Sequence, residues 1–180
     1  MFTGTYTAIV TPFKNGQLDE KALERLIKSQ IAGGVDGIVP VGTTGESPTL
    51  SFEEHIRVIE LAVKFAGKRL KVLAGTGANS TSEAVYLTQE AEKAGADGSL
   101  QVAPYYNKPT QRGLYLHFQA VAEAVNLPIV VYNIASRTAV NIEPETFAQL
   151  ATIKNIVAVK ESSGSLEQMS RILQLTRGKL

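Results

Sequence analysis

The sequence predicts an α/β protein built on a parallel β-sheet covered by helices. Short apolar runs alternate with segments of helical period six times along the 180 residues, at roughly 30 residues per unit. No linker, low-complexity tract or charge block interrupts this alternation, so residues 1–180 are expected to form a single domain. Polar residues gather directly after the predicted strands, where parallel-sheet proteins place their sites.

Two architectures share this alternation of strand and helix. One is an open, doubly wound sheet, which a chain of this length fills comfortably. The other is a barrel of eight such units, which usually needs about 250 residues. Length alone therefore favours the open sheet.

The first half of the chain carries three strand–helix units. Strands are expected at residues 6–10, 37–41 and 70–74, with a turn at Asn15-Gly16. Each following helix begins at a side chain that can accept a hydrogen bond from the first turn: Asp19, Ser51 with Glu54, and Ser80 with Glu83. The last two pairs have capping-box spacing, and Gly33-Gly34 closes the first helix.

The second half repeats the pattern with strands at residues 99–103, 128–132 and 156–160. Pro144 suits the first turn of a short helix, and Ser165 with Gln168 caps the last helix. A weak internal repeat relates the two halves, because residues 34–37 (Gly-Val-Asp-Gly) and 95–98 (Gly-Ala-Asp-Gly) each stand between a helix and a strand.

Composition excludes several kinds of partner and site. A net charge of +1 argues against nucleic acid or an anionic membrane surface, and no apolar run is long enough to span a membrane. The chain has no cysteine, and its two histidines are not spaced as metal ligands, so no metal site is expected. Residues 1–13 lack the features of a signal peptide, and a cytoplasmic location is expected.

Lys160 is the residue on which a functional hypothesis depends. It ends the apolar run 155–159, which predicts a strand buried on both faces. Burial disfavours the charged form of an amine, so such a lysine can act as a nucleophile toward carbonyl carbon. The alternative is a lysine whose ammonium group reaches solvent along its stem.

Other polar residues follow the neighbouring strands. Because their loops are expected to meet at one end of one sheet, they indicate a site. They are Thr43, Thr44, Tyr105, Tyr106, Tyr132 and Arg137. Glycines around the two threonines leave backbone N–H groups free to bind a carboxylate, and a tyrosine beside an amine can move protons. Taken singly, each also fits an ordinary turn, core or surface position. Residues 42–47 lack the lysine of a phosphate loop, and residues 75–77 lack the third glycine of a dinucleotide loop.

Four segments together resemble the dihydrodipicolinate synthase family of pyruvate-dependent class I aldolases. They are residues 42–47 (Gly-Thr-Thr-Gly-Glu-Ser), 104–111 (Pro-Tyr-Tyr-Asn-Lys-Pro-Thr-Gln), 132–138 (Tyr-Asn-Ile-Ala-Ser-Arg-Thr) and 159–164 (Val-Lys-Glu-Ser-Ser-Gly). The similarity runs along the whole chain, in order and at the family's spacing. It implies a (β/α)8 TIM barrel of which this chain holds six βα units.

The resemblance also implies a reaction and its residues. Lys160 would form a Schiff base with pyruvate, and Tyr132, linked through Thr44 to Tyr106, would relay protons. Thr43 and Thr44 would hold the pyruvate carboxylate, and Arg137 would receive the carboxylate of L-aspartate 4-semialdehyde. The family serves lysine and diaminopimelate biosynthesis, and neither a metal nor an organic cofactor is implied.

Two further expectations follow from the same resemblance. Tyr106 would reach the site of a neighbouring subunit, which implies a homo-oligomer, a dimer or a tetramer. Asn79, Glu83 and Tyr105 match part of the family's lysine-feedback site, where Phe52 replaces a histidine found in some members. The alternatives left open are an N-acetylneuraminate or 2-keto-3-deoxy-sugar lyase, although Arg137 and the double threonine favour the first reading.

The chain departs from the family pattern in two ways. Ala135 and Ala139 replace a usual proline and glycine near Arg137, which could loosen that loop. The seventh and eighth strands are missing, which would leave two open sheet edges. Three explanations remain open: a part of a longer protein, completion by another chain, or a shortened relative with little or no activity.

Overall fold

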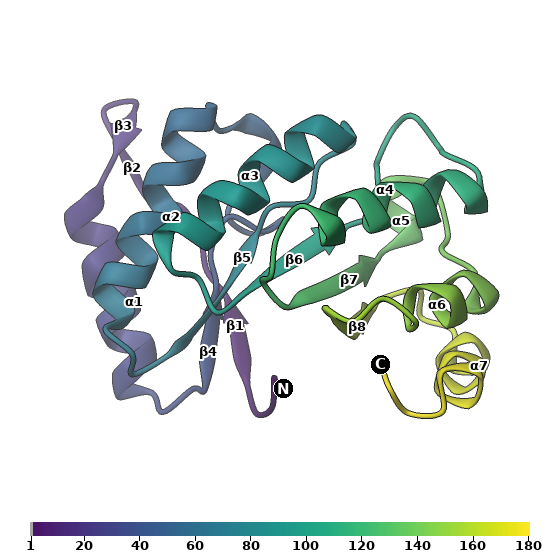
Figure 1. Ribbon diagram of the computed structural model, residues 1–180. Coiled ribbons are helices and arrows are strands. Elements are labelled where there is room, and N and C mark those ends of the chain that lie inside the picture. Colours follow the sequence, from purple (N-terminus) through teal and green to yellow (C-terminus); the bar gives the residue numbers. More distant parts are fainter. Residues whose placement is uncertain (1) are drawn as a thin grey trace.

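The computed structural model describes residues 2–180 and contains one six-stranded parallel sheet (Figure 1). The strand order is β1-β4-β5-β6-β7-β8, which follows the order of the chain. The strands are β1 (Tyr6–Ala8), β4 (Gly37–Val39), β5 (Lys71–Gly75), β6 (Gly98–Val102), β7 (Ile129–Asn133) and β8 (Ile156–Glu161). All six predicted strands are confirmed, with ends that differ by one or two residues.

The helices follow the strands in alternation. They are α1 (Glu20–Ala32), α2 (Phe52–Ala66), α3 (Thr81–Ala94), α4 (Gln111–Glu123), α5 (Ala135–Thr138), α6 (Pro144–Leu150) and α7 (Leu166–Thr176), with the short 3₁₀ helix η1 (Ser47–Thr49). Successive large helices pack against one another, and α2 and α3 also contact β5 and β6. Figure 1 shows α2, α3 and α4 lying side by side over one face of the sheet.

This strand order decides between the two architectures. A doubly wound sheet reverses its strand order at one point, whereas a barrel adds each new strand beside the previous one. Right-handed crossovers that always move in one direction place every helix on the same face, so the sheet curves with its helices outside. The preference for an open sheet, drawn from length alone, is therefore wrong, and the sheet is six units of a TIM barrel.

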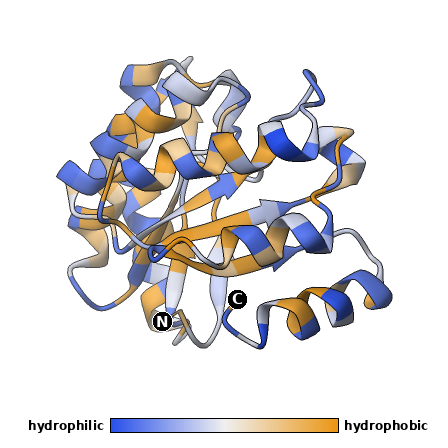
Figure 2. Ribbon diagram, turned by 45° about the vertical axis from the view of Figure 1, so that its right-hand side comes forward, coloured by the Kyte–Doolittle hydropathy of each residue, from blue (hydrophilic) through white to orange (hydrophobic). Residues whose placement is uncertain are grey.

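The two faces of the sheet carry two apolar clusters, because successive side chains of a strand point to opposite faces. Ile38, Val72 and Val131 belong to the large core between the sheet and the helices. Their neighbours line the concave face, which we call the inner cluster: Val39, Leu73, Leu100, Val130 and Tyr132. In Figure 2 the strands are largely apolar, while the helices alternate between apolar and polar positions.

Helix capping mostly follows the predictions. Asp19 accepts a hydrogen bond from the amide of Ala22, Ser51 and Glu54 form the complete capping box of α2, and Ser165 accepts from Gln168. The predicted cap of α3 is wrong. The Ser80 hydroxyl lies 3.0 Å from that of Ser82 and makes no capping bond, so α3 begins without a side-chain cap.

The internal repeat has a structural explanation at the start of two strands. Asp36 accepts a 2.7 Å hydrogen bond from the amide of Thr5 beside β1, and Asp97 accepts a 2.9 Å bond from the amide of Val72 in β5. Asp36 therefore ties the start of β4 to its neighbour β1, and Asp97 ties the start of β6 to its neighbour β5.

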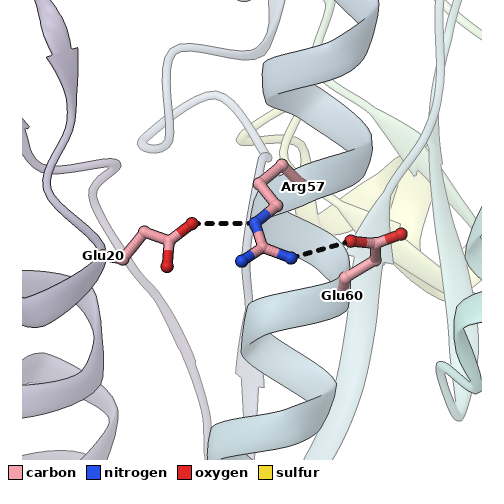
Figure 3. A network of polar contacts seen from close by, with 3 residues as sticks. All are labelled: Glu20, Arg57 and Glu60. Atoms are coloured by element: carbon pink, nitrogen blue, oxygen red, sulfur yellow. Dashed lines mark hydrogen bonds and ion pairs between the residues drawn. The ribbon is translucent and has the colours of Figure 1, made fainter.

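Two surface features complete the fold. Asn15 and Gly16 turn with φ values of 53° and 75° between the short strands β2 (Phe13–Lys14) and β3 (Gln17–Leu18), so the turn was predicted but its hairpin was missed. On the outer surface, Arg57 of α2 bonds Glu20 of α1 at 2.8 Å and Glu60 at 3.2 Å (Figure 3). These exposed ion pairs contribute little stability.

Candidate active site

Lys160 and Tyr132 lie side by side at the carboxyl ends of β8 and β7. The two residues are register partners, and the Lys160 Nζ lies 4.0 Å from the centroid of the Tyr132 ring. An ammonium group at this distance over a ring is attracted by the ring's quadrupole. Because Tyr132 belongs to the inner cluster and register partners in a parallel sheet point to the same face, Lys160 faces the concave side.

Lys160 is predicted to be buried, and within residues 2–180 this prediction is wrong. The side chain is exposed, and Val157, Ala158 and Val159 before it are only half-buried. The reason is the position of β8 at the edge of the sheet, where a strand has a neighbour on one side alone. An apolar run such as 156–159 predicts a strand but not whether both of its sides are covered.

A cavity of about 240 Å³ opens beside this pair, on the concave side of the strand ends. It is bounded by the inner-cluster residues Leu100 and Tyr132 and by polar residues of three loops. These polar residues are Thr43, Ser47, Tyr105, Arg137 and Thr138. The structure thus brings four of the sequence-predicted residues, Thr43, Tyr105, Tyr132 and Arg137, to one cavity.

The loop of Thr43 is fixed by unusually close backbone packing. Val41, before the loop, has φ of 47°, which is strained for a β-branched residue. A Cβ on Gly75 would lie 2.5 Å from the Val41 carbonyl oxygen, and one on Gly45 would lie 2.9 Å from the Val41 nitrogen. The Thr11 hydroxyl also donates a 2.7 Å hydrogen bond to the Gly45 carbonyl. Two glycines are therefore needed for the chain to turn here.

Three of the predicted residues lie apart from the cavity lining. Lys160 contacts the cavity through Tyr132, Thr44 is exposed on its loop, and Tyr106 is 88% exposed with φ of 76°. Within residues 2–180, no hydrogen bond joins Tyr132, Thr44 and Tyr106. Because Tyr106 is expected to act in the site of a neighbouring subunit, the relay stays a prediction. The outward position of Tyr106 leaves it free to contact another molecule.

Arg137 lies on the short helix α5, next to the two unusual alanines. Ala139 follows the helix with φ of 59°, a conformation that favours glycine. The buried Thr138 hydroxyl bonds the carbonyls of Ile134 and Val140 at 3.1 and 2.9 Å, which ties the turn to the residue that follows β7. These two bonds hold the turn with an alanine at this position, and Arg137 is exposed at the mouth of the cavity.

The residues that match a feedback site gather on the other side of Tyr105. Glu83 and Tyr105 border a small cavity of about 50 Å³ together with Phe52, and the Asn79 carbonyl accepts a 3.0 Å hydrogen bond from Asn107. Burial, followed by the charge of Glu83, raises the pKa of the Tyr105 hydroxyl above its usual value. Tyr105 thus forms a wall between the two cavities.

A polar network behind Lys160 was missed by the sequence reasoning. The fully buried Asn133 bonds the carboxylate of Glu161 and the amide side chain of Asn141, and Gln168 joins the same groups. The signal was present in the sequence, since Asn133 follows Tyr132 and Glu161 follows Lys160. Alternation along a strand places such neighbours behind the site residues.

Residues 2–180 contain no group of three or more histidine, cysteine or acidic side chains arranged to hold a metal ion. None of their helices combines the length and apolar character needed to cross a membrane.

Comparison with known proteins places this geometry in a family. The chain is 63% identical over 175 residues to the 4-hydroxy-tetrahydrodipicolinate synthase of Syntrophus aciditrophicus, covering 97% of this chain and 60% of that protein. The solved synthase of Methylacidiphilum fumariolicum superimposes with a TM-score of 0.95 at 55% identity, covering 97% and 59%.

A second solved structure adds a ligand to the comparison. It is the chloride-inhibited dihydrodipicolinate synthase of Acinetobacter baumannii in complex with pyruvate, with a TM-score of 0.95 at 49% identity, covering 98% of this chain and 61% of that one. The chain thus spans about three fifths of the length of these relatives. A family model described as the dihydrodipicolinate synthetase family matches residues 1–180, and this chain belongs to that family.

Proposed function

We propose that this chain carries the pyruvate-binding part of a 4-hydroxy-tetrahydrodipicolinate synthase, with residues 1–180 folded as one partial barrel domain. Such an enzyme is a lyase that condenses pyruvate with L-aspartate 4-semialdehyde in lysine and diaminopimelate biosynthesis. The observation that carries the proposal is the pairing of Lys160 with Tyr132 at 4.0 Å, beside a cavity that Thr43 and Arg137 border.

The proposed reaction begins at the Lys160 amine. Its nitrogen bonds to the keto carbon of pyruvate, and loss of water gives an imine. The imine then withdraws electrons as the methyl group loses a proton, which leaves an enamine. The Lys160 amine lies over the Tyr132 ring, and the hydroxyl of that ring is the proposed proton carrier.

The second half of the reaction uses the other substrate. The enamine carbon bonds to the aldehyde carbon of L-aspartate 4-semialdehyde, whose oxygen takes up a proton. The amino group of that substrate then displaces Lys160 and closes the ring. Arg137, exposed at the cavity mouth, is the proposed partner of the incoming carboxylate, since a guanidinium binds a carboxylate with two parallel hydrogen bonds.

The threonines and Tyr106 have supporting roles in this proposal. Thr43 borders the cavity and, with Thr44, offers hydroxyl and N–H groups to the pyruvate carboxylate. The exposure of Tyr106 supports a homo-oligomer. Because the residue is 88% exposed on its own chain, it can complete the relay of another subunit. Asn79, Glu83 and Tyr105 are proposed to contribute to a feedback site for L-lysine.

A substrate assay tests the proposed activity. The chain is mixed with pyruvate and either L-aspartate 4-semialdehyde or aldehyde sugars, and consumption of pyruvate is followed. We expect consumption only with L-aspartate 4-semialdehyde, and Arg137→Ala should weaken its binding. Consumption with N-acetylmannosamine or glyceraldehyde instead would favour a sugar lyase, and no consumption at all would favour a shortened relative without activity.

A further inference from the structure

The strand that carries Lys160 contains a β-bulge, and this makes its register a point of weakness. Ile129 of β7 pairs with Ile156, but the next residue, Val130, pairs with Ala158, so Val157 is the extra residue of β8. The bulge brings Lys160 opposite Tyr132. Without it, pairing would shift by one residue and Lys160 would turn to the helix face of the sheet.

A hydrogen-bonded pair lies one residue beyond Lys160 and Tyr132, on the opposite face. Asn133 and Glu161 are also register partners, and the Asn133 Nδ2 donates to the Glu161 carboxylate oxygens at 3.2 and 3.0 Å. Asn133 is fully buried, and its Oδ1 accepts a 3.0 Å bond from the amide of Ile142. Every polar atom of this side chain is therefore committed.

The same carboxylate also holds the loop that follows Lys160. The Ser163 amide donates to Glu161 Oε1 at 2.6 Å, and Gln168 of α7 donates to Oε2 at 3.0 Å. Asn141 completes the network, bonded to both Asn133 and Gln168. Because β8 is an edge strand, these bonds and its pairing with β7 are what hold its end.

We propose that Asn133 and Glu161 are positioning residues, which fix the register of the bulged strand β8 and so keep the Lys160 amine beside Tyr132. The inference rests on the proposed function for its chemical consequence, while its register claim stands on the geometry alone. Neither side chain contacts the cavity, so both act through Lys160.

Hydrogen exchange tests the register directly. Asn133→Ala should accelerate amide exchange of residues 158–163 at least tenfold. The matched control is Asn155→Ala, since Asn155 lies just before β8 and also donates from one amide group to several carbonyls, Ala122 at 2.9 Å among them. The control should not accelerate residues 158–163. Equal protection of these amides in Asn133→Ala and the unsubstituted chain would overturn the proposal.

Trapping of the pyruvate imine with borohydride tests the consequence. Asn133→Ala should lower the maximal rate of trapping on Lys160 by about tenfold or more, because a small misplacement of a reacting group is costly, while the half-saturating pyruvate concentration stays within about twofold. Asn155→Ala should change neither value. A rate unaffected by Asn133→Ala in a chain that forms the adduct would overturn the proposal.

An exchange of donor and acceptor provides a rescue. Asn133→Asp alone places two carboxylates together and should lower the trapping rate and the protection of β8. Adding Glu161→Gln reverses the direction of the hydrogen bond and should restore most of both. Failure of the double variant to recover either would contradict the proposal. If the unsubstituted chain forms no adduct, the proposed function fails, and hydrogen exchange still decides the positioning claim.

Discussion

At the scale of single residues, the site depends on backbone approaches that only glycine permits. Gly75, at the end of β5, lies against the carbonyl of Val41. Val41 has a φ of 47°, which turns the chain toward Thr43. The strain at Val41 is maintained because the surrounding backbone leaves it no room to relax. The position of Thr43 at the cavity is thus set from a neighbouring strand.

Gly75→Ala should therefore destabilise the chain and displace the Thr43 loop. The added Cβ would lie 2.5 Å from the Val41 oxygen and 2.8 Å from the Gly42 nitrogen, and overpacking of this kind costs about 1–3 kcal/mol. Gly33→Ala is the control, since its Cβ would approach nothing closer than 3.3 Å. Urea unfolding of both variants measures the difference, and equal losses would refute this account of the loop.

Tyr132→Phe separates the two properties of the tyrosine. The ring over the Lys160 Nζ remains, while the hydroxyl that is proposed to carry protons is removed. The variant should stay folded and still bind pyruvate, but imine trapping should slow by about a hundredfold, which is typical of a lost acid–base group. The rate of imine trapping by borohydride is measured for both proteins. An unchanged rate would exclude the hydroxyl from the relay.

The gathering of these polar residues at one end of the sheet was predictable from the sequence, and their exposure was not. Lys160, Tyr132, Thr43 and Arg137 each follow an apolar run, and the ends of such runs meet at one edge of a parallel sheet. Exposure depends on what covers a strand from the side. For Lys160 that is a property of the sheet edge, which no local pattern records.

At the scale of elements, α3 and α4 are joined by a buried histidine. His117 of α4 is 5% exposed, its Nδ1 lies 2.9 Å from the Thr81 hydroxyl at the start of α3, and its Nε2 has no hydrogen-bond partner in the described part of the chain. Burial lowers the pKa of His117 to about 4, since the charged ring would lose its hydration. This contact ties the start of α3 to α4.

The depressed pKa makes stability depend on pH in one direction. Between pH 6.5 and 4 the unfolded chain binds a proton at His117 that the folded chain does not, so stability falls as pH falls through this range. The loss should reach about 3 kcal/mol at pH 4. Urea unfolding from pH 7 to 4 measures it.

His117→Gln is the comparison that isolates this residue. His55, whose pKa burial also lowers, is present in both proteins and cancels in the difference. The variant should lose the share of the pH dependence that His117 contributes. A pH profile identical to that of the unsubstituted chain would show that His117 is not the group responsible.

Elements with a local chemical signal were predictable, and those without one were not. The capping box of α2 and the proline in the first turn of α6 were correctly read from a few neighbouring residues. The same spacing failed at α3, because the Ser80 hydroxyl has a competing partner in Ser82. The hairpin of β2 and β3 was missed, since its strands have two residues each.

At the scale of the whole molecule, residues 2–180 form a curved sheet with two open edges, β1 and β8. The barrel class could not be fixed from element counts, because six units suit an open sheet equally well. It followed from the family motifs, and the sequential strand order confirms it. Edge strands with unpaired backbone groups are prone to pair with other chains.

The open edge predicts association of this chain in solution at high concentration. Val157→Lys would place a charge at the bulge of β8 and should reduce concentration-dependent association, because edge charges oppose strand pairing. Val10→Lys is the control, since Val10 is 50% exposed and lies outside the strands. Sedimentation velocity over a range of concentrations measures both variants, and an equal effect of the two would argue against association through β8.

The most direct test of the central claim is where pyruvate attaches. The chain is incubated with pyruvate and borohydride, digested, and mapped by mass spectrometry, with Lys160→Arg as the control and the other lysines as internal references. We expect a reduced three-carbon adduct on Lys160 that is absent from the control. A Lys160 that stays unmodified, or an adduct spread evenly over exposed lysines, would contradict it.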